Sequence, residues 1–208
     1  MKRVILPIMN LDILLALAGF AVATLFSPGP NNLMLMASGA NYGLRRTLPH
    51  LLGVAMGFPL LALSVGLGLG ALFEAWPVAR LVLEAVSVVF LLWLAWKVAT
   101  AAPPGERSAE GRPLTFLQAA SFQWVNPKAW AMALGAMSLY AATGGWARVA
   151  LVAGVFAALG LGSATTWTLI GTRIRRLLTG PRRLRAFNWT MALLLLGSLW
   201  PIVAPLLR

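Results

Sequence analysis

Six long apolar runs limit the solvent in which this chain can fold. They cover about residues 11–39, 47–73, 78–99, 114–140, 147–171 and 187–207. An apolar helix of about 20 residues spans the hydrocarbon core of a bilayer. Charged residues make up 11% of the sequence, less than half of the roughly 25% that is usual for a soluble domain. The sequence therefore predicts an all-α integral membrane protein with six transmembrane helices.

The basic residues predict how these spans are oriented. Most lie in the first, third and fifth connections, as in Arg45 and Arg46 and the arginine-rich segment 173–185. Because lysine and arginine are enriched in cytoplasmic loops, we expect these connections in the cytoplasm and both termini on the periplasmic side. The net charge of +12 is then explained by topology and by anionic lipid. A nucleic-acid partner is not expected.

Proline and glycine divide the chain into two similar halves. Residues 1–208 are expected to form a single transmembrane domain, with a first repeat at about 11–100 and a second at about 114–208. The linker at about 101–113 contains Pro103, Pro104 and Gly105, which is typical of a connecting loop. Three spans per half require the second repeat to be inverted relative to the first.

The opening span of each half is interrupted near its middle. The first span contains Ser27-Pro28-Gly29-Pro30 and the fourth contains Asn126-Pro127. Paired breaks at matching positions are a known sign of a transporter binding site at the bilayer midplane. The alternative is that each proline only kinks a packing helix.

The first break predicts a restarted half-helix with Pro30 at its first position, where proline is tolerated. The amides of Asn31, Asn32 and Leu33 would then point into a cavity without partners, and such a helix end suits a carboxylate. The second break adds further polar groups. The candidate substrate-binding and translocation residues are Ser27, Pro28, Gly29, Pro30, Asn31, Asn32, Asn126, Pro127 and Lys128.

Lys128 is unusual because it lies about 14 residues into its span, or about 21 Å along a helix. A charge at that depth is costly unless it faces protein or water. We expect its ammonium to face the cavity and to balance a substrate carboxylate; the alternative is that it extends to the outer interface. Glu84 and Asp12 are possible coupling carboxylates. Alternatively, Glu84 pairs with Arg80 on the same helix, and Asp12 is interfacial.

Three other features have simpler interpretations. His50 is expected to pack at the membrane interface. Gly53 and Gly57 form a G-x-x-x-G pattern that predicts close helix packing. The hydroxyl of Ser163 is expected to bond to helix carbonyls. Cysteine is absent and histidine occurs once, so no metal site or cofactor is expected, and no nucleophile–base pair suggests catalytic residues or an enzyme.

Several motifs resemble those of the LysE/RhtB family of bacterial amino-acid exporters. The first is the run 27–32, followed by the Gly-Leu-Arg-Arg of 43–46 and by Gly53. The second is Phe-Gln-Trp-Val-Asn-Pro-Lys-Ala-Trp at 122–130, and a weaker third motif lies at 90–97. The resemblance covers about residue 11 to the end of the chain. Members that export cysteine and O-acetylserine are the most similar in the first span.

The resemblance implies six spans, an inner-membrane location, export driven by the proton motive force, and a translocation site formed by the two broken helices. Phe90 and Ala95 replace a tyrosine and a glycine that are frequent in the family, so the identity of the amino acid stays open. The sequence also does not determine the coupling ion, whether the protein forms a homo-oligomer, or whether translation starts at Met1 or Met9.

Export of small amino acids or their derivatives is therefore the leading functional prediction, with a mechanism of alternating access around the two breaks. Two alternatives remain: a metal-ion exporter of the same superfamily and a non-transporting membrane scaffold. Scarce carboxylates and the absence of cysteine argue against the metal-ion exporter. A scaffold predicts that Lys128→Ala affects only stability.

Overall fold

The computed structural model describes residues 9–101, 112–143, 145–178 and 180–204, and within these ranges it contains helices and no strand. Most of the predicted linker and the segment before Met9 lie outside the described residues. The elements are α1 (Leu11–Phe26), α2 (Pro30–Ser64), η1 (Val65–Leu69), α3 (Gly70–Ala75), α4 (Pro77–Ala99), α5 (Phe116–Phe122), η2 (Gln123–Val125), α6 (Pro127–Tyr140), α7 (Gly145–Arg175), α8 (Pro181–Gly197) and α9 (Trp200–Val203).

Three helical segments of the described chain are long and apolar enough to cross a membrane: Pro30–Leu69, Leu81–Ala99 and Gly145–Arg175. Many large apolar side chains on the helices are exposed, such as Leu81 and Val89 on α4, as expected for a surface in contact with lipid. The prediction of an all-α membrane protein is confirmed. The count of six spans stays a prediction, because the breaks divide two predicted spans into shorter segments.

Proline and short polar caps set where the helices begin. Proline occupies the first turn of α2, α4, α6 and α8, where no helical partner for an amide is lost. The side chain of Asn10 accepts from the amide of Ile13 and caps α1. Thr115 and Gln118 form a capping box at the start of α5. These local signals start α1, α4 and α5 close to predicted span boundaries, and they restart helices at Pro30 and Pro127, within the predicted first and fourth spans.

A sharp bend divides α2 into two segments. Gly43 has a φ of 77°, a conformation that glycine adopts readily and other residues avoid. The segment before the bend continues the first predicted span, and the segment after it contains most of the second. The two segments therefore meet at the bend, and the second continues into η1.

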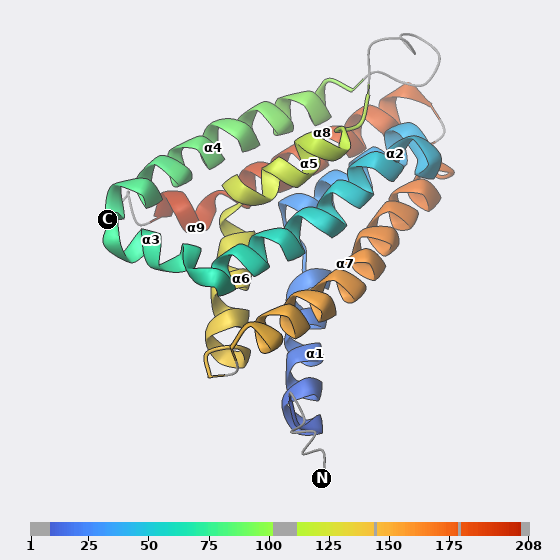
Figure 1. Cartoon of the computed structure of the whole chain (residues 1–208). Helices are drawn as coiled ribbons and strands as arrows, with labels where there is room; N and C mark the ends of the chain where they lie inside the picture. Colours follow the sequence, from blue (N-terminus) through green and yellow to red (C-terminus); the bar gives the residue numbers. More distant parts are fainter. Residues whose placement is uncertain (1–8, 102–111, 144, 179, 205–208) are drawn as a thin grey trace, which may run out of the picture.

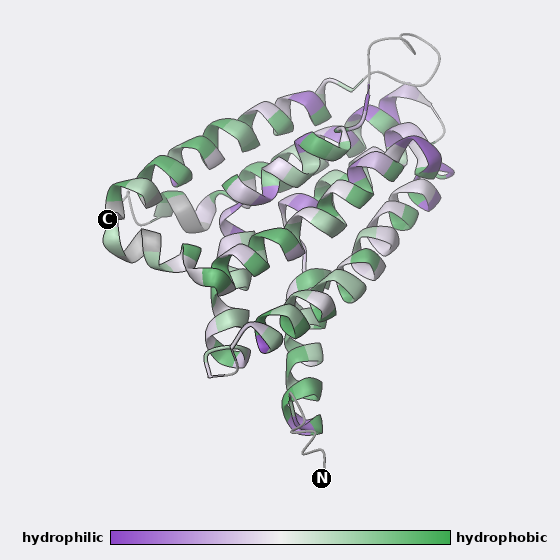
Figure 2. Cartoon of the chain, viewed as in Figure 1, coloured by the Kyte–Doolittle hydropathy of each residue, from purple (hydrophilic) through white to green (hydrophobic). Residues whose placement is uncertain are grey.

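One end of the bundle gathers the chain segments that are rich in arginine. Figure 1 shows the bend of α2, the end of α4, the start of α5, the end of α7 and the start of α8 at this end, and Figure 2 shows hydrophilic residues concentrated there. We call it the basic end. The three basic connections were predicted to lie on one side of the protein, and the described ends of these helices do lie together. Which side of the membrane they face stays a prediction.

Small residues allow the closest helix contacts. α2 and α7 share the most extensive interface, where a Cβ on Gly39 would collide with the backbone of Thr168, and one on Gly171 with the backbone of Met36. Gly57 lies directly against the backbone of Ala120 on α5, and Gly53 contacts the same helix. The predicted close packing of the G-x-x-x-G pattern is therefore confirmed.

Candidate substrate-binding site

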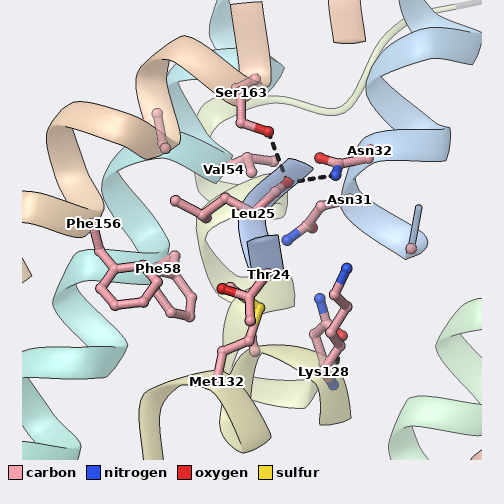
Figure 3. A pocket seen from close by; sticks show the side chains of 16 residues that line it. Thr24, Leu25, Asn31, Asn32, Val54, Phe58, Lys128, Met132, Phe156 and Ser163 are labelled. Atoms are coloured by element: carbon pink, nitrogen blue, oxygen red, sulfur yellow. Dashed lines mark hydrogen bonds between the residues drawn. The ribbon is translucent and has the colours of Figure 1, made fainter. Parts of the chain in front are cut away.

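The two helix breaks meet at one cavity of about 40 Å³, which we call the central cavity. Asn31, Asn32 and Lys128 line one side of it, and the rings of Phe58 and Phe156 line another (Figure 3). This volume accommodates a few water molecules. An amino acid is larger, so side chains around the cavity must move before one can bind.

Polar side chains compensate the backbone carbonyls that the first break leaves without helical partners. The carbonyl of Leu25 accepts from the side-chain amide of Asn32 at 2.7 Å and from the hydroxyl of Ser163 at 2.8 Å (Figure 3). The same Asn32 amide donates to the carbonyl of Ser27 at 2.8 Å. In hydrocarbon an unpaired carbonyl costs several kcal/mol. These bonds make a broken helix tolerable at this depth.

The ammonium of Lys128, which belongs to the second break, bonds to oxygens of the first break. Its Nζ donates to the carbonyl of Ser27 at 3.0 Å, the hydroxyl of Ser27 at 2.8 Å and the carbonyl of Pro28 at 3.2 Å. We call these three oxygens the ammonium cradle. A Cβ on Gly29 would lie 2.9 Å from both Cδ and Nζ of Lys128, so the glycine leaves room for the lysine side chain. None of the described cavity-lining residues is acidic.

The start of α2 follows the prediction with one correction. Gly29 is its N-cap and Pro30 its first residue. The amide of Leu33 donates to the carbonyl of Gly29 at 2.9 Å, so the prediction that it points freely into the cavity was wrong: it is already the first amide to find a helical acceptor. The amides of Asn31 and Asn32 precede any such acceptor, as the opening amides of a helix do.

The second break is stabilised by two local hydrogen bonds and by one from α4. Asn126, which is only 1% exposed, accepts from the amide of Lys128 at 3.1 Å and thereby caps α6. The indole of Trp130 donates to the carbonyl of Trp124 at 2.8 Å. The hydroxyl of Ser87 on α4 donates to the carbonyl of Val125. Pro127 follows the cap as the first residue of α6, so the N-terminal ends of α2 and α6 both border the central cavity.

A reciprocal pair of hydrogen bonds between neutral side chains also joins the two breaks. Asn31 Nδ2 donates to Gln123 Oε1 at 2.8 Å, and Gln123 Nε2 donates back to Asn31 Oδ1 at 3.1 Å. Gln123 is fully buried and also donates to the carbonyl of Ala119. Gln123 was not among the predicted site residues, although it lies within the second motif.

Ser163 lines the central cavity but was also not among the predicted site residues. Its hydroxyl was expected to bond to helix carbonyls, and it does so across helices, from α7 to the broken end of α1. Thr166, on the same helix, bonds to the carbonyl of Gly162 within its own helix. A sequence pattern cannot distinguish these two uses of a hydroxyl.

The two possible coupling carboxylates lie away from the central cavity. Asp12 is exposed in the first turn of α1, and Glu84 is partly buried on α4; neither lines the cavity. The side chain of Arg80 lies outside the described part of the chain, so the predicted pairing with Glu84 is untested. A role for either carboxylate in coupling also stays a prediction.

Comparison with known proteins places this geometry in a family. The profile of the LysE type translocator matches residues 22–198. A cysteine/O-acetylserine efflux protein of Klebsiella pneumoniae is 32% identical over 181 residues, covering 85% of this chain and 89% of the relative. A protein of the same name from Escherichia coli K12 is 29% identical, covering 85% and 90%. No solved structure matches. The chain belongs to the LysE-type translocator family.

Proposed function

We propose that this protein exports a small amino acid or amino-acid derivative across the bacterial inner membrane, with the central cavity as the binding site. Family membership and relatives named for cysteine and O-acetylserine efflux support export of this substrate class. The observation that carries the proposal is the position of Lys128, whose ammonium links the two helix breaks and faces no carboxylate among the described residues lining the cavity.

The cavity has complementary groups for both charges of a zwitterion. The N-terminal ends of α2 and α6 carry partial positive charge and favour a carboxylate. The ammonium cradle at the C-terminal end of α1 consists of carbonyl and hydroxyl oxygens, which favour an ammonium group. Broken helices that present opposite ends to a midplane cavity are a recurrent arrangement in secondary transporters.

Substrate binding on this proposal requires Lys128 to leave the cradle. The lysine ammonium occupies the oxygens that the substrate ammonium would use, and the cavity is too small for both. The substrate ammonium takes the three oxygens of the cradle, and the displaced Lys128 ammonium pairs with the substrate carboxylate. The exchange replaces one set of charge-assisted hydrogen bonds by another, so it does not leave an unpaired charge in the membrane interior.

The contacts between helices support two inverted repeats. The first break packs on α7, where Ser163 bonds to Leu25, and the second break packs on the second segment of α2, where Gly57 meets Ala120. Each predicted repeat thus supports the broken helix of the other. We propose alternating access around the two breaks, driven by the proton motive force, with both termini in the periplasm. Among the described residues no cluster of three potential metal ligands favours the metal-ion alternative.

The proposal is tested by efflux from cells that lack their own exporters. The strains carry the wild type, Lys128→Met, Gly29→Ala or the exposed control Arg182→Gln at matched membrane levels. Growth inhibition is scored with single amino acids, with O-acetylserine and with divalent metals. We expect the wild type and the control to resist a few amino acids, and both cavity variants to lose that resistance. Lys128→Met removes the ammonium that would pair with the substrate carboxylate, and the added methyl of Gly29→Ala fills the space beside the cradle.

Two outcomes contradict the proposal. Equal sensitivity of all strains to every amino acid would remove the assigned substrate class. Resistance that persists in Lys128→Met would separate transport from the central cavity.

A further inference from the structure

A second cavity of about 30 Å³ lies toward the basic end of the bundle. It is bordered by the first segment of α2 near Ser38, by the second segment at His50, by the end of α4 at Lys97, and by the residues that precede α5 at Arg112. We call it the basic-end cavity. None of the described residues that line it is acidic.

His50 contributes a buried polar atom without a partner to this cavity. The residue is 1% exposed, so the expectation of interfacial packing does not describe its surroundings. Its Nδ1 lies 3.0 Å from the hydroxyl of Ser38. Its Nε2 is the one buried side-chain nitrogen or oxygen of the described chain that has no hydrogen-bond partner. When the Ser38 hydroxyl donates to Nδ1, the neutral imidazole carries its proton on Nε2 and requires an acceptor.

Two cations of the same cavity also lack an anionic partner in the described chain. Lys97 Nζ lies 5.2 Å from the centroid of the Trp93 ring, a contact that leaves the hydrogen-bond donors of the ammonium unused. Arg112 is exposed at the edge of the cavity. The amide of Asn41 is unavailable, because it is paired reciprocally with Asn188 at 2.7 and 3.0 Å. The donors that remain all favour an anion.

We propose that the basic-end cavity binds a carboxylate, and that its occupant is the carboxylate of the transported amino acid before it reaches the central cavity. The identity of the occupant rests on the proposed function. Ser38 in this cavity is six residues after Asn32 in the central cavity, or about 9 Å along one helix segment. The basic-end cavity would therefore be an entry site from the side where the basic connections lie.

Binding is tested on the purified full-length protein by thermal unfolding, because a ligand of the folded state raises the Tm. The probe is sodium acetate, compared with sodium chloride at equal ionic strength. We expect acetate to raise the Tm of the wild type, of Lys128→Met and of the control Arg45→Gln, which removes an exposed charge from the same end. In Lys97→Met and Arg112→Gln the acetate concentration for half of the effect should rise about tenfold, as expected for one lost charge-assisted bond.

Transport in proteoliposomes tests the occupant. Lys97→Met and Arg112→Gln should raise the KM on the basic side about tenfold at unchanged kcat, because they weaken binding without touching the central cavity. If the wild type transports amino acids and both variants behave like Arg45→Gln, the inference fails and the proposed function stands. If the wild type transports no amino acid, but Lys97→Met and Arg112→Gln still weaken the effect of acetate on the Tm, the proposed function fails. A carboxylate site with another occupant then stands.

Two further results would overturn the inference. An equal effect of chloride and acetate on the wild type would show only general screening of charge. A larger acetate effect in the double variant Glu106→Gln/Glu110→Gln than in the wild type would mean that the linker carboxylates compete for the cavity, and that the linker, not the substrate, is its occupant.

Discussion

The carbonyl of Leu25 offers a sharp test of why this helix break is stable. It accepts from two side chains, Asn32 and Ser163, which come from different helices. Either donor alone keeps the carbonyl paired. We predict that replacing both residues, as Asn32→Leu and Ser163→Ala, destabilises the protein by more than the sum of the single replacements.

The size of this non-additive effect follows from the number of hydrogen-bond donors that the Leu25 carbonyl keeps in each variant. Each single replacement removes one hydrogen bond to Leu25, which is worth about 0.6 kcal/mol on average between membrane helices. Asn32→Leu also removes the bond to the carbonyl of Ser27, but Lys128 still donates to that oxygen. The double replacement leaves the Leu25 carbonyl without any donor, which adds a desolvation penalty of about 1–3 kcal/mol. The excess over additivity should therefore be about 1–3 kcal/mol.

The assay is the Tm of the purified protein in one detergent at a fixed heating rate. For a chain of this length 1 kcal/mol corresponds to about 2–4 °C, so the double variant should melt about 2–12 °C below the additive expectation. The control cycle combines Asn32→Leu with Thr166→Ala, which removes a hydroxyl that bonds within its own helix. We expect the control cycle to be additive.

Additivity of the Asn32 and Ser163 replacements to within about 0.3–0.5 kcal/mol would refute the reasoning. It would mean that the Leu25 carbonyl reaches another donor when both side chains are lost. The two polar residues would then have to be explained by the substrate alone.

Two other predictions concern helix packing and the hydrogen-bonded pair of Asn31 and Gln123. Gly171→Ala should strongly lower the Tm and the amount of protein in the membrane, because the added methyl collides with the backbone of Met36. Such overpacking costs about 1–3 kcal/mol. The control Gly162→Ala adds a methyl in open space and should be nearly neutral. A Tm of Gly171→Ala equal to that of the control would contradict the close contact. Gln123→Leu should lower the Tm because it leaves the side-chain amide of Asn31 without a hydrogen-bond partner. Adding Asn31→Leu should restore much of the loss, since removing both partners of a buried bond is often nearly neutral. A double variant that melts below Gln123→Leu would contradict this prediction.

The positions of the breaks could be predicted from the sequence because proline acts locally. The end of α1 before Ser27 and the restart of helices at Pro30 and Pro127 follow from the missing amide and the fixed φ of proline. The close packing at Gly53 and Gly57 is equally local in origin, because the spacing alone places both residues on one helix face. The expectation that Lys128 faces a cavity agrees with its position among the cavity-lining residues.

The partners across the cavity could not be predicted in the same way. Lys128 bonds to Ser27, 101 residues away, and Ser163 bonds to Leu25, 138 residues away. Such pairs depend on how the two halves meet, which periodicity does not specify. The surroundings of His50 were missed for a related reason: its neighbours in sequence include Arg45, Arg46 and Pro49, while its burial comes from other parts of the fold.

The contact between α2 and α7 limits how this transporter can move. α2 belongs to the first predicted repeat and α7 to the second, and at Gly39 and Gly171 their backbones touch without intervening side chains. An interface of this kind has no side-chain rotamers that could rearrange. Sliding one helix along the other would therefore open a gap that no side chain can fill. We therefore expect α2 and α7 to remain together as a fixed frame during transport. On this expectation, access to the central cavity changes through the shorter segments at the breaks and not by rocking of the two predicted repeats as rigid halves.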